Sequence, residues 1–116
     1  MTLNLTCEET PITVLKADDD TLPFAVTDEN GDAVSVAGAT FTFRVLPTQY
    51  SANTAKLIEK DEGDMTIDAG EGTGSIPVTA EDKAALDVGA YYYHLHMVES
   101  NGTDTTLMRG AFRVVG

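Results

Sequence analysis

The sequence predicts an all-β sandwich of about seven to eight antiparallel strands, with one short helical turn before the penultimate strand. Apolar and polar residues alternate with a period of two along most of the chain. Clusters of Gly, Asn, Asp and Pro separate these runs at short intervals, and only one segment has a helical pattern. A chain of 116 residues with 42% hydrophobic residues is expected to form one domain with its own core.

The expected elements follow this alternation along the chain. Residues 1–10 are predicted to be an N-terminal arm or a first strand, because Leu3, Leu5 and Cys7 alternate with polar residues. Residues 11–116 are predicted to be the sandwich domain, with Pro23 placing one strand end at a sheet edge. Strands are expected at 12–16, 21–27, 39–46, 55–60, 65–68, 75–78, 90–99 and 103–115.

The single helical segment lies between the strands expected at 75–78 and 90–99. Thr79 is expected to cap it, Glu81 and Asp82 suit its first turn, and Leu86 closes it. It spans two turns at most. Sandwich domains often have a short helical crossing at this position, before the penultimate strand.

The residues after this turn carry the most specific motif in the chain. Asp87, Gly89 and Tyr91 reproduce the spacing of the immunoglobulin corner Asp-x-Gly-x-Tyr-x-Cys, and Leu86 fits as its apolar anchor. In that corner the glycine allows a tight turn, and the tyrosine hydroxyl bonds back to the backbone. Tyr93 stands where antibody domains have a cysteine. The expected fold is therefore an immunoglobulin-like β-sandwich without the antibody disulfide.

A wider pattern over residues 11–115 resembles the small immunoglobulin-like domains of tailed-phage structural proteins, such as the N-terminal domain of the baseplate upper protein. The matching stretches are "TLPFAVTDENGDAVSVAGATFTFRV", "VTAEDKAALDVGAYYYHLHM" and "LMRGAFRVV". The matching residues are Phe24, Val26, Asp28, Gly31, Gly38, Ala39, Thr40, Phe43, Gly89, Tyr91, Tyr93, Gly110, Phe112 and Val114. These are mostly residues that form a fold, so the resemblance implies architecture more directly than function.

The resemblance implies a non-enzymatic structural component of a virion or prophage particle. Its place would be in the tail or baseplate, or on the capsid as a decoration, and both positions remain open. Its partners would be other virion proteins and copies of itself. Residues 1–10 contain Glu8 and Glu9 and do not form a signal-peptide pattern, so synthesis in the host cytoplasm followed by localisation in the virion is expected.

The charge balance excludes some partner classes. With 19 acidic and 7 basic residues the net charge is -12, which argues against nucleic acid and against anionic membranes. Two interpretations of the acidity remain open. It is either a coat that keeps the protein soluble or a surface built to meet a basic partner.

No residues assemble into a convincing catalytic or metal-binding pattern. Cys7 has no spacing that ties it to a histidine, so the chain is interpreted as a non-enzyme with no cofactor. His94 and His96 are two apart on a strand and share one face, which suits zinc if a third ligand comes from a neighbouring strand. The favoured interpretation is that they are two surface histidines with no metal.

One outer face of the predicted sandwich is expected to carry the arginines and both histidines of the chain, together with an exposed tyrosine. On the strand expected at 39–46, Phe41, Phe43 and Val45 are predicted to face the core, and Thr42, Arg44 and Leu46 to face outward. On the last two strands the residues predicted to face the core are Tyr91, Tyr93, Leu95, Met97, Phe112 and Val114. The alternation then places every arginine of the chain on the opposite side of one sheet. The predicted interface consists of Arg44, Tyr92, His94, His96, Arg109 and Arg113. Tyr and Arg are enriched at interface centres, so this face is expected to dock on an acidic surface. The alternative is a host-surface or carbohydrate-binding adhesin module, although the chain has no Trp for a sugar platform.

Overall fold

The computed structural model describes residues 8–9, 11–27 and 30–116. In these ranges the chain forms strands β1 (Glu8–Glu9), β2 (Ile12–Leu15), β3 (Asp20–Ala25), β4 (Thr40–Leu46), β5 (Ile58–Asp61), β6 (Thr66–Asp68), β7 (Thr73–Val78), β8 (Gly89–Val98) and β9 (Asp104–Val115). The helical elements are α1 (Ala80–Lys83) and the 3-10 turns η1 (Asn53–Ala55) and η2 (Glu62–Asp64). Of the predicted arm, residues 1–7 and 10, including Cys7, lie outside the described residues.

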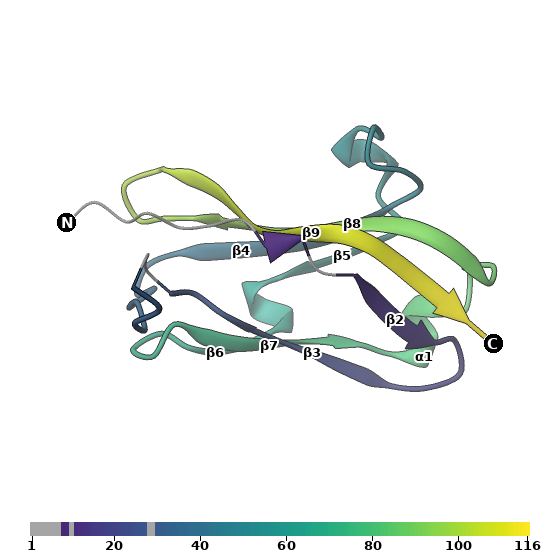
Figure 1. The fold of residues 1–116 in the computed structure, drawn as a ribbon, viewed down its shortest axis with the longest axis horizontal. Coiled ribbons are helices and arrows are strands. Elements are labelled where there is room, and N and C mark those ends of the chain that lie inside the picture. The colour runs from purple at the N-terminus through teal and green to yellow at the C-terminus, as the bar shows by residue number, and fades with distance from the viewer. Residues whose placement is uncertain (1–7, 10, 28–29) are drawn as a thin grey trace.

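The strands form two sheets that pack face to face (Figure 1). The large sheet has the order β1-β9-β8-β4-β5, and β2 also pairs with β9. The small sheet has the order β3-β7-β6. The small sheet of β3, β7 and β6 thus lies opposite the sheet that contains the long C-terminal hairpin β8–β9. This is the division of an immunoglobulin-like sandwich, so the predicted fold class is confirmed.

The strand directions differ from the expectation in one respect. β1 and β2 pair with β9 in parallel, in register Glu8 with Met108 and Ile12 with Phe112, whereas an entirely antiparallel arrangement was predicted. The chain enters and leaves along the same edge of the large sheet in the same direction (Figure 1). Period-two alternation identifies strands but contains no information about which neighbour each one pairs with, so this feature was not predictable from the pattern.

The core lies between the sheets and is rich in aromatic rings. Phe41, Phe43, Tyr93 and Phe112 are each at most 1% exposed. The ring of Phe43 lies 5.8 Å from that of Tyr93 and 6.3 Å from that of Phe112, and Phe24 from the small sheet lies 5.4 Å from Phe41. The inward positions predicted for β4, β8 and β9 are therefore correct, and their alternate residues lie on the outer face of the large sheet.

The predicted helical turn is confirmed as α1, immediately before β8. The Thr79 hydroxyl accepts from the backbone N–H of Asp82, and the Asp82 carboxylate accepts from the N–H of Thr79 at 2.9 Å. This reciprocal capping satisfies backbone donors that a single turn would leave open. Lys60 of the large sheet adds an ion pair with Asp82 at 2.8 Å.

A buried lysine holds α1 against the turn between β2 and β3. Lys83 is fully buried, and its ammonium donates to the carbonyl oxygens of Leu15 and Asp18 at 2.6 Å each and to the carboxylate of Asp20 at 2.8 Å. Three acceptors match the three donors of an ammonium group. The charge is thus compensated, and the end of the sandwich where the chain passes from β2 to β3 is fixed in place.

Candidate docking face

The outer face of the large sheet carries a row of four polar side chains across four strands. In the register, Glu59 of β5 lies opposite Arg44 of β4, Arg44 opposite His94 of β8, and His94 opposite Arg109 of β9. Directly opposed residues of neighbouring strands project from the same face of a sheet. Three of the predicted interface residues, Arg44, His94 and Arg109, are therefore brought together in one row.

The Arg44 end of this row is fixed by ion pairs. The Nε of Arg44 donates to Glu59 at 2.8 Å, and the Nζ of Lys56 donates to the other carboxylate oxygen at 3.0 Å. Hydrogen bonds from Arg44 and then from Lys56 lower the pKa of Glu59 below its ordinary value. The guanidinium of Arg44 is thus oriented by its own sheet, and its charge is largely balanced there.

His94 is a buried residue, which corrects the prediction of two surface histidines. It is 7% exposed, because long side chains flank it on both neighbouring strands and the ring of His96 packs edge-on against it at 4.5 Å. Burial, followed by the positive charges of His96 and Arg44, lowers the pKa of His94 to about 4. His94 is therefore neutral at physiological pH and contributes packing instead of charge.

His96, two residues after His94 on β8, lies on the same face of the sheet. Its Nδ1 lies 3.1 Å from the carboxylate of Asp104 and 3.5 Å from the hydroxyl of Thr106. His94 and His96 thus share a face as predicted. Within the described ranges, no cluster of three or more His, Cys, Asp or Glu side chains is arranged to hold a metal ion.

The other two arginines lie along β9. Arg109 and Arg113 are both exposed, and Arg113 pairs in register with Ala90. They are four positions apart along the extended strand, a distance of about 13 Å. Arg113 therefore lies on the same outer face as the row but outside it. It is farther along β9 than Ala111, the residue opposite Tyr92.

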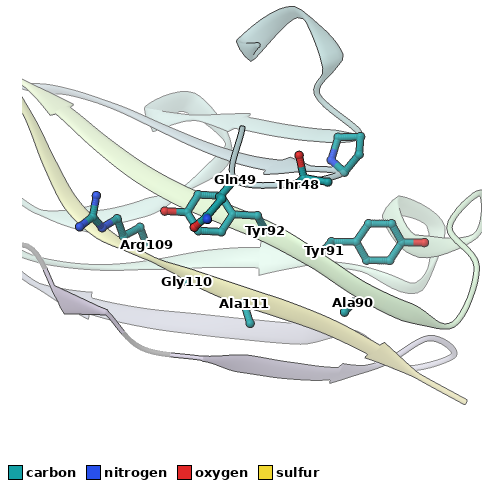
Figure 2. A pocket seen from close by; sticks show the side chains of 9 residues that line it. Thr48, Gln49, Ala90, Tyr91, Tyr92, Arg109, Gly110 and Ala111 are labelled. Atoms are coloured by element: carbon teal, nitrogen blue, oxygen red, sulfur yellow. The ribbon is translucent and has the colours of Figure 1, made fainter. Parts of the chain in front are cut away.

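A groove lies between the middle of β9 and the segment that follows β4, and residues 90–92 of β8 also line it. It has a volume of about 430 Å³ and is bounded by Pro47, Thr48 and Gln49 on one side and by Arg109, Gly110 and Ala111 on the other. In Figure 2 the hydroxyl of Tyr92 points toward the side of Arg109, and Gln49 lines the same groove. The predicted interface residues Tyr92 and Arg109 thus line one hollow, together with backbone and amide groups able to form hydrogen bonds.

Thr48 and Gln49 were not among the predicted site residues, because residues 48–54 were interpreted only as a loop. The structure places this segment beside the outer face, where η1 contacts β4 (Figure 1). Leu46 shows the same effect. It was predicted to face outward with Thr42 and Arg44, yet it is 2% exposed. Alternation along one strand contains no information about which other residues cover its outer face.

The corner residues lie next to this face. Leu86 is buried, and the hydroxyl of Tyr91 donates to the carbonyl oxygen of Asp87 at 2.7 Å. Gly89 differs from its expected role. Its φ is not positive, and a Cβ there would meet no atom within 4 Å, so this corner does not require a glycine at position 89. The tyrosine bond, and not the glycine, defines the corner in this chain.

No helix in the described part of the chain combines the length and the apolar character needed to cross a membrane. Neither a protein-family model nor a curated protein matches the sequence. The docking face is therefore defined by the residues and geometry of this chain alone.

Proposed function

We propose that the protein is a non-enzymatic structural component of a tailed-phage virion or prophage particle. It is a tail, baseplate or capsid-decoration module that docks on other virion proteins and on copies of itself. The phage assignment rests on the sequence resemblance over residues 11–115. The observation that supports docking is the outer face of the large sheet, where all three arginines of a chain with a net charge of -12 lie together with Tyr92.

The chemistry of this face favours an acidic protein surface as its partner. Arg109 and Arg113 are exposed on this face. An arginine presents a planar fork of donors that matches a carboxylate. A copy of this chain supplies such carboxylates, because its acidic residues outnumber its basic ones by 19 to 7. The groove beside Tyr92 gives the partner a concave place to bury side chains.

The rigidity of the face suits docking on repeated sites. β8 and β9 are the longest strands, they pair along nearly their whole length, and their inner faces are fixed in the core. A surface held in shape before binding loses little conformational entropy on association. A face that meets an acidic region elsewhere on the next copy forms a head-to-tail contact, which closes into a ring or extends as a filament.

Sedimentation velocity tests this proposal. The wild-type protein is expected to form oligomers as its concentration rises and to dissociate as salt is added, because exposed charge pairs are screened. Arg109→Glu is expected to abolish the oligomers. Lys16→Glu changes the net charge by the same amount in the β2–β3 turn and is expected to leave them intact. A monomer under all conditions, or equal loss in both variants, would show that this face does not mediate self-docking.

A second candidate function, a carbohydrate or host-surface adhesin, is favoured by one observation. The groove combines the ring of Tyr92 with the side chains of Gln49, Thr48 and Arg109, which are groups that contact sugars (Figure 2). A glycan-array experiment with Tyr92→Ala and Tyr50→Ala separates the two functions, since Tyr50 is 88% exposed and does not line the groove. Glycan binding that is lost only in Tyr92→Ala supports the adhesin function.

A further inference from the structure

The connection between β4 and β5 carries Tyr50, whose side chain is 88% exposed. This is the highest exposure among the large hydrophobic side chains in the part of the chain that the structure describes. Figure 1 shows the connection projecting away from the two sheets. Tyrosine is enriched at the centres of protein interfaces, where its ring is buried and its hydroxyl forms hydrogen bonds. A single exposed ring is common on protein surfaces, but the structure around this one fits it for a contact.

A network of hydrogen bonds holds the turn that presents Tyr50. The backbone N–H of Tyr50 donates to the hydroxyl of Thr48 at 3.3 Å, and that hydroxyl lies 3.1 Å from the hydroxyl of Ser51. The N–H of Ser51 donates to the carbonyl oxygen of Thr48 at 3.1 Å, which closes the turn. At the base of the connection the N–H of Leu57 donates to the carbonyl oxygen of Val45 at 2.7 Å. A side chain presented by such a preformed turn loses less conformational entropy on binding.

The groove beside Tyr92 fits a tyrosine ring. Ala90 and Ala111 contribute only methyl groups to its lining, next to the larger side chains of Tyr92 and Arg109 (Figure 2). Its volume of about 430 Å³ lies in the range of roughly 300–1,000 Å³ that sites for small organic molecules occupy. A guanidinium such as that of Arg109 attracts the face of an aromatic ring, and an amide such as that of Gln49 can form a hydrogen bond with a phenolic hydroxyl.

The chain does not use its own Tyr50 to fill this groove. Gln49 lines the groove, whereas Tyr50, the next residue, does not. Residues 47–55 contain no charged side chain, although the chain as a whole has a net charge of -12. The connection can therefore approach another copy without adding to the repulsion between two chains of the same net charge. We propose that Tyr50 of one copy inserts into the groove beside Tyr92 of a second copy, a contact that rests on the self-docking in the proposed function.

Sedimentation velocity of substituted chains tests this contact. Tyr50→Ala is expected to weaken self-association about tenfold or more, because a tyrosine buried at an interface is a frequent hot spot. Val88→Ala is the matched control, since Val88 is 58% exposed and does not line the groove, and self-association is expected to stay as in the wild type. Both variants are expected to keep the wild-type Tm, because both side chains are exposed.

A mixture of two defective variants tests whether the tyrosine and the groove belong to one contact. Ala111→Trp fills the groove from β9 and leaves Tyr50 intact, and it is expected to weaken self-association as strongly as Tyr50→Ala does. Mixing the two variants is expected to give heterodimers, because one copy still offers a tyrosine and the other an open groove. The wild-type chain has no tryptophan, so tryptophan absorbance follows Ala111→Trp alone in the mixture.

Three results would overturn the tyrosine contact. They are self-association of Tyr50→Ala equal to that of the wild type, an equal loss in Val88→Ala, and the absence of heterodimers in the mixture. If Arg109→Glu abolishes the oligomers while Tyr50→Ala keeps them, the docking face of the proposed function stands and only the tyrosine contact fails. If neither substitution changes the oligomers, the proposed docking face fails as well.

Discussion

Both sheets pack against one core, but their outer faces differ in chemistry. The large sheet presents long cationic and aromatic side chains, with Arg44, His94 and Arg109 in one row. The small sheet presents small side chains at the positions Thr21, Pro23, Ala25, Thr66, Asp68, Thr73, Ser75 and Pro77. Asp68 is the one charged residue among these eight. This contrast is the reason for proposing the outer face of the large sheet, and not that of the small sheet, as the docking surface.

The same difference predicts which substitutions should change stability and which should change docking. The inner faces hold the sheets together through buried rings, while the outer residues of the large sheet contribute through ion pairs that are partly exposed. Burial of a large side chain contributes several kcal/mol, and an exposed ion pair contributes less than about 1 kcal/mol. Changes on the outer face should therefore alter docking while leaving the fold intact.

The largest effect is expected between the inner and outer sides of β4. Phe43→Ala is expected to lower the free energy of unfolding by about 3–5 kcal/mol, because Phe43 is 1% exposed and contacts two other rings. Thr42→Ala, on the adjacent outer position, is expected to change it by less than about 1 kcal/mol. Urea denaturation measures both. Comparable losses would mean that the outer face is as important for stability as the core.

The next effect depends on pH and on His94. The pKa of His94 is about 4 in the folded protein against 6.5 for an ordinary histidine, so between these values the unfolded chain binds a proton that the folded chain does not. The free energy of unfolding therefore falls as the pH falls from 6.5 to 4, by at most about 3 kcal/mol from this group. Urea titrations at pH 7 and pH 4 should show a smaller drop for His94→Gln than for wild type. Identical drops would contradict the burial of a neutral His94.

A smaller effect is expected at the end where the two sheets are joined. Lys83→Met is expected to cost about 2 kcal/mol, because it leaves the carbonyl oxygens of Leu15 and Asp18 without the donor that they have now. Lys60→Met is the matched control, since its ion pair with Asp82 is partly exposed, and a loss below about 1 kcal/mol is expected. Thermal unfolding of the two variants ranks them. The reverse order would show that Lys83 does not fix this junction.

The smallest effect on stability is expected in the outer row. Arg44→Ala is expected to change the free energy of unfolding by less than about 1 kcal/mol, because its pair with Glu59 is accessible to solvent. The same variant removes one of the two cations that contact Glu59, the other being Lys56, and so makes this end of the docking face more acidic. If urea denaturation shows a loss of free energy of unfolding well above about 1 kcal/mol, the row contributes to the stability of the fold.

The sequence pattern predicted the inward residues of β4, β8 and β9 and the capped turn at Thr79, because both depend on local periodicity and side-chain chemistry. It did not predict the burial of His94 or of Leu46, because alternation along one strand does not specify which side chains of other elements cover its outer face. The parallel pairing of β2 with β9 was missed for the same reason. For the docking face, alternation placed the arginines together, but it contained no sign of the groove that Thr48 and Gln49 complete.

The measurement that tests the central claim most directly is a concentration series of two-dimensional amide NMR spectra of the wild-type protein. If the outer face of the large sheet is the docking surface, chemical-shift changes with concentration should centre on the amides of Tyr92, His94, Arg109 and Gln49. A head-to-tail contact also shifts amides of the acidic region that this face meets on the next copy, so a second group of changes is expected elsewhere. Changes that leave out the outer face of the large sheet, or no changes up to millimolar concentration, would contradict the account.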